Sequence, residues 1–208
     1  NRNKISNLYF DLNNLYKFSF VNPEKSSNII SLLPIWLFAE FLEFLHKNKK
    51  DALYNIKNIL AISSSSAITK KYSYNGFDRD LVSKLISAEI KIRKICLINN
   101  INFCIIRPSL IYGRSGEYID KNISLIVKFL KFLPIIIIPR STGLRQPIHC
   151  SQLALAIYKL LYENQSLNNE IINIGGDEEI SYKLMLDRIF ENYISKKIFK
   201  SIFYINLP

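Results

Sequence analysis

Short apolar runs alternate with longer amphipathic segments along most of the chain. The short runs end at polar or breaker residues, which is typical of buried strands. They lie at 5–12, 28–33, 57–62, 102–107, 134–139 and 170–174. Segments with apolar residues at helical spacing lie at 35–47, 78–99, 118–132, 151–163 and 181–194. This alternation predicts an α/β protein with a doubly wound parallel sheet.

Composition excludes several classes of protein. At 208 residues, 49% hydrophobic and 22% charged, the chain is close to the globular average, so a disordered protein is not expected. The longest uncharged run, 26–39, is interrupted by Pro34 and falls short of the ~18 residues of a membrane span. The three cysteines form no CxxC or Cys/His cluster, which argues against disulfides and zinc. We expect a soluble protein of the reducing cytoplasm.

The net charge of +11 first suggests a nucleic-acid partner. However, the 20 Lys and 8 Arg are accompanied by 35 Ile and 3 Val, a bias typical of AT-rich coding, and no basic run exceeds two residues. The excess is concentrated in 61–150, which carries +9, whereas 151–208 carries −1. We therefore do not expect a nucleic-acid partner, and RNA binding stays a weaker alternative.

Three polar features invite a functional interpretation. Ser63–Ser66 follow an apolar strand, at the strand end where open α/β sheets bind ligands, although a plain polar loop has the same composition. Gly175-Gly176 precede the acidic Asp177–Glu179, which would repel phosphate, so we interpret the pair as a structural turn. His149 has no acidic neighbour in sequence and is predicted to be a packed residue that closes a strand.

Five motifs, taken in order, resemble an extended short-chain dehydrogenase/reductase of the NAD-dependent epimerase/dehydratase family. They are ILAISSSSAITK (59–70), SKLISAE (83–89), IIRPSLIYG (105–113), GLRQPIH (143–149) and NIGGDEEISY (173–182). The resemblance covers about residues 5–190. It implies a Rossmann-type NAD(P)-binding sheet without its first strands, whose Gly-rich turn would lie upstream of Asn1. It also implies a partial NAD(P)-binding domain at 1–115 and a substrate-binding part at 116–208, with no clear linker between them.

The resemblance also implies a catalytic group. In the family, a Ser or Thr, a Tyr and a Lys four residues later act together, and the Lys binds the nicotinamide ribose and lowers the pKa of the Tyr. Ser65 and Lys84 match the first and last positions, but Asp80 occupies the Tyr position. A short, easily ionised carboxylate beside Lys84 is a weak base. The alternatives left open are Tyr72 or Tyr74 as a substitute, and a non-catalytic dinucleotide-binding module.

The remaining implied roles concern cofactor, substrate and partner. NAD or NADP would be the cofactor, and a nucleotide sugar or a related metabolite the substrate. A homodimer would form through the helices at 35–50 and 78–99. The residues that match the family's cofactor-binding positions are Asp11, Leu33, Pro34, Lys84, Arg107 and Pro108, and those that match substrate-binding positions are Tyr112 and Arg145.

Overall fold

The computed structural model describes residues 27–132, 135–139, 143–163, 167–193 and 201–205. Asp11 and the strand predicted at 5–12 lie outside these ranges. The chain divides into two compact units, 1–106 with 164–171, and 107–163 with 172–208. The functional division predicted near residue 115 stays a prediction.

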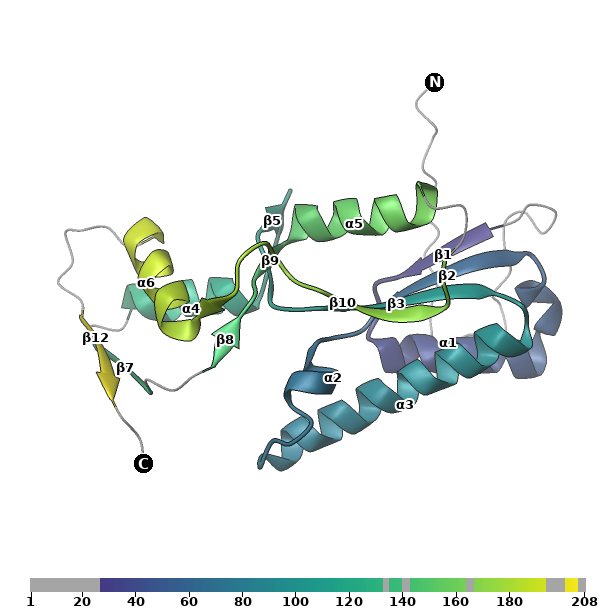
Figure 1. The fold of residues 1–208 in the computed structure, drawn as a ribbon, viewed down its shortest axis with the longest axis horizontal. Helices are drawn as coiled ribbons and strands as arrows, with labels where there is room; N and C mark the ends of the chain where they lie inside the picture. The colour runs from purple at the N-terminus through teal and green to yellow at the C-terminus, as the bar shows by residue number, and fades with distance from the viewer. Residues whose placement is uncertain (1–26, 133–134, 140–142, 164–166, 194–200, 206–208) are drawn as a thin grey trace, which may run out of the picture. The chain divides into compact units, whose positions relative to one another are not determined.

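A four-stranded sheet forms the centre of the first unit (Figure 1). Its strands, in spatial order, are β1 (Ser27–Ser31), β2 (Ile56–Ile62), β3 (Asn102–Pro108) and β10 (Glu170–Ile174). β2 runs parallel to both β1 and β3. Ile59, Leu60 and Ala61 of β2 are fully buried, as expected for a parallel strand covered on both faces. The predicted parallel α/β sheet of Rossmann type is confirmed.

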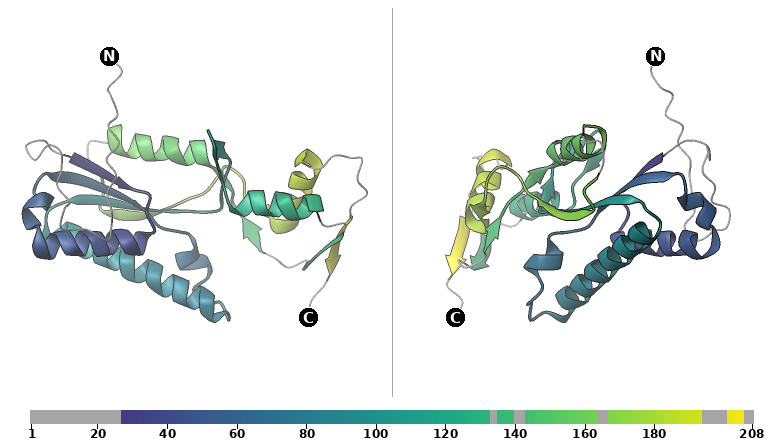
Figure 2. Two further views of the ribbon diagram at one scale, coloured as in Figure 1. Left: turned by 180° about the vertical axis from the view of Figure 1, so that it is seen from behind. Right: turned by 45° about the vertical axis from the view of Figure 1, so that its right-hand side comes forward.

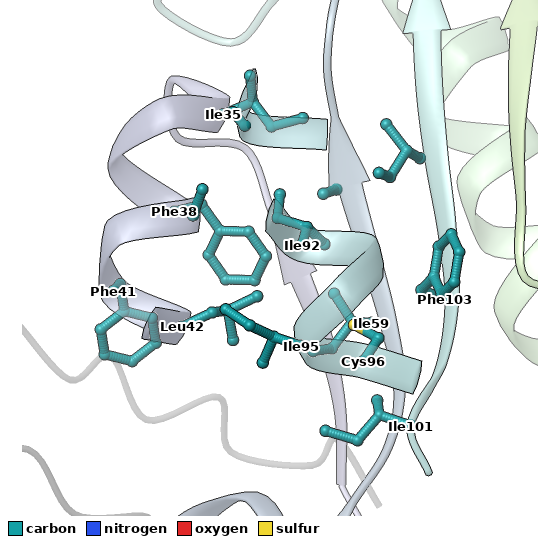
Figure 3. Close-up of a cluster of buried hydrophobic side chains, with 14 of the residues drawn as sticks. Ile35, Phe38, Phe41, Leu42, Ile59, Ile92, Ile95, Cys96, Ile101 and Phe103 are labelled. Carbon is teal, nitrogen blue, oxygen red and sulfur yellow. The ribbon is translucent and has the colours of Figure 1, made fainter. Parts of the chain in front are cut away.

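Two long helices lie side by side on one face of this sheet (Figures 1 and 2). The helical segments of this unit are α1 (Ile35–Asn48), the short 3₁₀ helix η2 (Lys50–Leu53), α2 (Ser66–Thr69) and α3 (Gly76–Ile98). In Figure 3, Phe38 and Leu42 of α1 lie with Ile92 of α3 in one buried cluster. Burial raises the pKa of the Cys96 thiol in the same cluster to about 12, so this cysteine stays protonated. All three cysteines are free, as predicted.

An ion-pair bridge links the exposed surfaces of α1 and α3. Glu43 of α1 accepts hydrogen bonds from Lys47, at 2.8 Å, and from Lys91 of α3. These bonds lower the pKa of the Glu43 carboxyl from its usual 4.5 to about 2. Folding therefore favours the charged form of Glu43.

We expect this bridge to make the first unit acid-sensitive. Its stabilisation is complete above pH 4.5, the pKa of the unfolded chain, and is lost as the pH falls towards 2. Glu43→Gln should therefore flatten the fall of unfolding free energy between these pH values, measured by urea unfolding at a series of pH values. The control is Glu40→Gln. Glu40 is exposed on the same helix and forms no ion pair with a described residue. Equal acid sensitivity in both variants would contradict the assignment.

In the part of the second unit that the structure describes, short strand pairs accompany three helices. Its elements are β4 (Ile111–Tyr112), β5 (Arg114–Ser115), β6 (Tyr118–Ile119), α4 (Asn122–Phe132), β7 (Ile135–Pro139), β8 (Leu144–Arg145), β9 (Ile148–His149), α5 (Cys150–Tyr162), β11 (Ile180–Ser181), α6 (Tyr182–Tyr193) and β12 (Ser201–Ile205). β4 pairs with β9, β5 with β6, β7 with β12, and β8 with β11. A second buried cluster contains Leu130, Ile180, Met185, Leu186 and Ile189. No helix in the described ranges is long and apolar enough to span a membrane.

The start of α4 differs from the sequence prediction. A helix was expected from 118, but Tyr118–Ile119 form a strand and α4 begins at Asn122. The physical reason is Asp120, whose carboxylate accepts hydrogen bonds from the backbone N–H groups of Ile123, at 2.6 Å, and Ser124, at 3.3 Å. Its other oxygen accepts from Gly113 N–H, at 3.2 Å. The aspartate thus caps the helix and ties its start to the preceding loop.

Candidate functional site

The serines after β2 have different roles. Ser63 donates a hydrogen bond to the carboxylate of Glu89 on α3, at 2.5 Å, and Glu89 is only 2% exposed. The Ser64 hydroxyl accepts from the backbone N–H of Ser66, at 3.2 Å. The half-buried Ser65 has no hydrogen bond from its hydroxyl to any described residue. Ser66, also half-buried, has no hydrogen bond from its hydroxyl to a described residue either, so Ser65 is one of two serines at this strand end whose hydroxyls are available to a ligand, and the one that matches the family's Ser/Thr position.

Asp80 and Lys84 lie on the first turns of α3, one helical turn apart. Both side chains are exposed, and neither forms a hydrogen bond or ion pair with a described residue. Ser65 immediately precedes α2, and α2 contacts α3 (Figure 1). The first unit thus carries all three residues of the predicted catalytic group, on consecutive elements. Their catalytic roles stay predictions.

The loop between α2 and α3 is fixed to the start of α3. Asp78 accepts from Lys70, at 2.7 Å, and from the Ser73 hydroxyl, at 3.0 Å, and the Lys70 bond contributes most to lowering the pKa of Asp78. Tyr72 and Tyr74 of this loop are 85% and 102% exposed. Their rings stand in solvent, so the structure offers no contact that supports either as a substitute for the missing tyrosine.

Other predicted cofactor-binding residues lie at carboxyl ends of the strands. Leu33 and Pro34 follow β1 and are exposed. Arg107 and Pro108 are the last residues of β3. Because β1, β2 and β3 are parallel, their carboxyl ends lie at the same end of the sheet. Open α/β sheets bind ligands at this end.

A groove of about 750 Å³ lies within the second unit. Ile180, Met185 and Ile189 of the buried cluster form part of its lining. Its lining consists of Tyr112, Ile123, Pro147, Gln152, Asp177, Glu178, Ile180, Met185, Arg188, Ile189 and Asn192. The Tyr112 ring packs edge-on against His149, with the ring centroids 5.2 Å apart. His149 ends β9 and its Nδ1 lies 2.7 Å from the Ser151 hydroxyl at the start of α5. The prediction that His149 is a packed residue that closes a strand is confirmed.

The polar residues of the groove are paired with one another. Arg188 donates from both terminal nitrogens to the two carboxylate oxygens of Glu178. This bond is the main reason why the pKa of Glu178 is lowered and that of Arg188 raised. Gln152 Nε2 donates to Asp177 Oδ2, at 3.2 Å.

Arg145 does not line this groove. Its Nη1 donates to the carbonyl of Leu144, at 2.8 Å, and its guanidinium lies over the Tyr182 ring, 5.4 Å from the centroid. Of the two residues matched to substrate positions, only Tyr112 lines the groove. No sequence pattern pointed to Arg188, Gln152 or Asn192, whereas Tyr112 and the motifs at 143–149 and 173–182 did point to this region.

The Gly-Gly pair brings two segments of the groove together. Gln146 Nε2 donates to the carbonyl of Gly176, at 2.8 Å. A Cβ at Gly176 would lie 2.0 Å from the carbonyl oxygen of Pro147, and one at Gly175 would lie 2.3 Å from the side chain of Gln146. Only glycine permits this close approach. The pair therefore has the structural role predicted for it, but through this close approach, since the chain is irregular at the two glycines and bends only at Asp177.

The chain resembles solved structures of nucleotide-sugar enzymes, whereas no family model and no curated protein sequence matches it. It is similar to dTDP-glucose 4,6-dehydratase from Bacillus anthracis in complex with NAD, with 19% identity, 88% of this chain and 61% of that chain covered, and a TM-score of 0.60. It is also similar to UDP-N-acetylglucosamine 4-epimerase from Bacillus cereus, with 17% identity, 94% of this chain and 71% of that chain covered, and a TM-score of 0.62. A third similar structure is GDP-mannoheptose C4 reductase from Campylobacter jejuni with NADP bound. Here the identity is 14%, 83% of this chain and 62% of that chain are covered, and the TM-score is 0.57.

These similarities establish the fold. The chain has the Rossmann-type fold of the dehydratase, the epimerase and the reductase, and spans about three fifths of the length of the first and the last. The resemblance to extended short-chain dehydrogenases/reductases is confirmed at the level of the fold.

Proposed function

We propose that the chain is part of an NAD(P)-binding epimerase/dehydratase-like protein that acts on a nucleotide sugar or a related metabolite. The observation that carries the proposal is the available Ser65 hydroxyl at the carboxyl edge of a sheet whose fold matches NAD- and NADP-bound enzymes. Lys84 supports it, because this exposed ammonium lies on the helix that α2 contacts and has no partner among the described residues.

Ser65 and Lys84 are the described residues that would serve the nicotinamide half of the cofactor. In the proposal, the Ser65 hydroxyl orients the substrate, and the Lys84 ammonium donates hydrogen bonds to the nicotinamide ribose. The bound cofactor would supply hydride chemistry. No Gly-rich turn that would hold the pyrophosphate occurs among the described residues.

Whether the proposed protein is catalytically active depends on Asp80, which occupies the position of the family's catalytic tyrosine. A carboxylate is shorter than a phenol and is ionised at neutral pH, so it takes up a proton only weakly. This observation favours, as a second candidate, a non-catalytic dinucleotide-binding module. Turnover of a sugar nucleotide or a related sugar by the unaltered protein would exclude that second candidate.

Homodimerisation through α1 and α3 belongs to the same proposal. A groove of about 590 Å³ lies between these helices. Ile90 and Ile98 line it and are 62% and 54% exposed. Both residues belong to α3, and exposed apolar residues of this kind suit a protein partner.

Cofactor binding tests the proposed function. We expect NADH or NADPH to bind the full-length protein of which this chain is part, and Lys84→Ala to weaken that binding at least tenfold, because it removes a charge-assisted hydrogen bond worth about 1.5–3 kcal/mol. Isothermal titration calorimetry measures both affinities. Lys94→Ala removes the same charge from an exposed position further along α3 and should bind as the unaltered protein does.

Two results would contradict the proposal. One is a folded protein that binds neither nucleotide. The other is a Lys84→Ala variant whose affinity equals that of Lys94→Ala, which would remove Lys84 from the cofactor site.

A further inference from the structure

The groove of the second unit is acidic, although the chain as a whole carries +11. Two carboxylates, Asp177 and Glu178, and one cation, Arg188, are the charged residues of its lining. Glu179, next in the chain, is also exposed. A ligand that enters this groove therefore meets net negative charge, which concentrates neutral or cationic molecules and repels anions.

The cation of the lining is already occupied. Both terminal nitrogens of Arg188 donate to the two oxygens of Glu178. A phosphate binds a guanidinium through the same two parallel hydrogen bonds. A phosphate therefore binds Arg188 through this pair of nitrogens facing Glu178 only if it displaces Glu178, and the neighbouring Asp177 repels it as well.

The other polar groups of the lining leave both acceptors and donors free, and the charged one among them is an acceptor. Asp177 Oδ1 has no hydrogen-bond partner among the described residues, whereas its Oδ2 accepts from Gln152. Both polar atoms of the Gln152 side chain form hydrogen bonds, since its Oε1 accepts from the backbone N–H of His149, at 3.2 Å. Asn192 donates to the carbonyl of Arg188, at 2.7 Å, which leaves its side-chain oxygen as a further acceptor. Because the free charged atom is Asp177 Oδ1, a matching ligand supplies a donor to it, namely a hydroxyl or ammonium group.

The rest of the lining is apolar. The Tyr112 ring, which is 36% exposed, and Ile123 and Ile189 present carbon surface beside these acceptors. A sugar ring offers both surfaces at once, since its C–H face packs on an aromatic ring and its edge carries hydroxyl groups. An amino sugar adds an ammonium group for Asp177.

We infer that this groove binds a phosphate-free amino sugar, and that Glu178 excludes phosphate-bearing ligands by occupying Arg188. The inference rests on the proposed function in one respect, because it identifies the related metabolite that the protein would act on. It assigns the binding of this ligand to Asp177 and the specificity to the Glu178–Arg188 pair.

Binding of two probes to the protein tests this inference. By ligand-observed NMR titration, we expect glucosamine to bind at least tenfold more tightly than UDP-glucose. Asp177→Asn should weaken glucosamine binding at least tenfold, because it replaces the anionic acceptor by a neutral amide. Tighter binding of UDP-glucose than of glucosamine would overturn the inference.

A gain of binding tests the role of Glu178. Glu178→Gln frees Arg188 and should strengthen UDP-glucose binding at least tenfold, and the double variant Glu178→Gln/Arg188→Ala should lose that gain. Glu179→Gln is the matched control, because it removes the same charge from an exposed residue outside the lining and should leave UDP-glucose binding unchanged. If Glu178→Gln and Glu179→Gln have the same effect, the assignment of Glu178 is overturned. Circular dichroism checks that each variant is folded.

The outcomes separate this inference from the proposed function. Binding of NADH or NADPH together with UDP-glucose preferred over glucosamine leaves the proposed function standing and removes the inference. Glucosamine binding that depends on Asp177, in a protein that binds neither nucleotide, removes the proposed function and supports the ligand class assigned to the groove.

Discussion

Gly176→Ala is expected to destabilise the second unit by about 3 kcal/mol or more. The added methyl group would lie 2.0 Å from the carbonyl oxygen of Pro147 and 3.0 Å from its carbonyl carbon. Both are backbone atoms, so no side-chain rotation relieves the contact, and one of the two segments must move. Because Gly176 precedes Asp177 and Pro147 lines the groove, that movement should also distort the groove.

The free energy of unfolding, measured by urea titration followed by circular dichroism, checks this expectation. Gly76→Ala is the matched control: its Cβ would meet only Arg79 Nη2, at 3.6 Å, at the first residue of α3. A glycine-to-alanine change without a clash stabilises by about 0.4–1 kcal/mol, mainly through the unfolded chain. A Gly176→Ala variant as stable as Gly76→Ala would show that the approach of Pro147 to Gly176 is not required.

The regular elements were predictable where the apolar period was long. The helix predicted at 78–99 is α3, Gly76–Ile98, because its apolar residues recur over six turns and Asn75, whose side chain accepts from Phe77 N–H at 3.0 Å, caps its start. The start of α4 was not predictable from this period, since 118–119 continue the apolar pattern. Only the position of Asp120 shows where the helix begins.

The candidate site was predictable only in part. Motif order identified Ser65 and Lys84, but four adjacent serines look alike in sequence, and only the position of Glu89 separates the anchoring Ser63 from the available Ser65. The groove residues come from positions as distant as Tyr112 and Asn192. No local pattern signals such a set, because the fold alone brings it together.

The contrast between Ser63 and Ser65 leads to a second large effect, on stability. Ser63→Ala should lower the free energy of unfolding by about 2 kcal/mol, because hydrogen bonds to charged groups contribute about 1.5–3 kcal/mol and Glu89 is buried. Ser65→Ala should change it by less than about 0.5 kcal/mol, since its hydroxyl has no partner among the described residues. Urea unfolding of the two variants, which differ by one hydroxyl each from the same protein, measures the difference.

Glu89→Gln distinguishes the hydrogen bond from the charge. The amide oxygen of glutamine can still accept from Ser63, but a neutral acceptor contributes less than a carboxylate. Ser63→Ala should therefore cost less in the Glu89→Gln background than in the unaltered protein, and a double-mutant cycle measures the coupling. A coupling near zero would mean that Ser63 does not depend on the Glu89 charge. The end of β2 would then be fixed by its backbone bond from Ser63 N–H to Ile106, at 2.7 Å, without a contribution from the Glu89 charge.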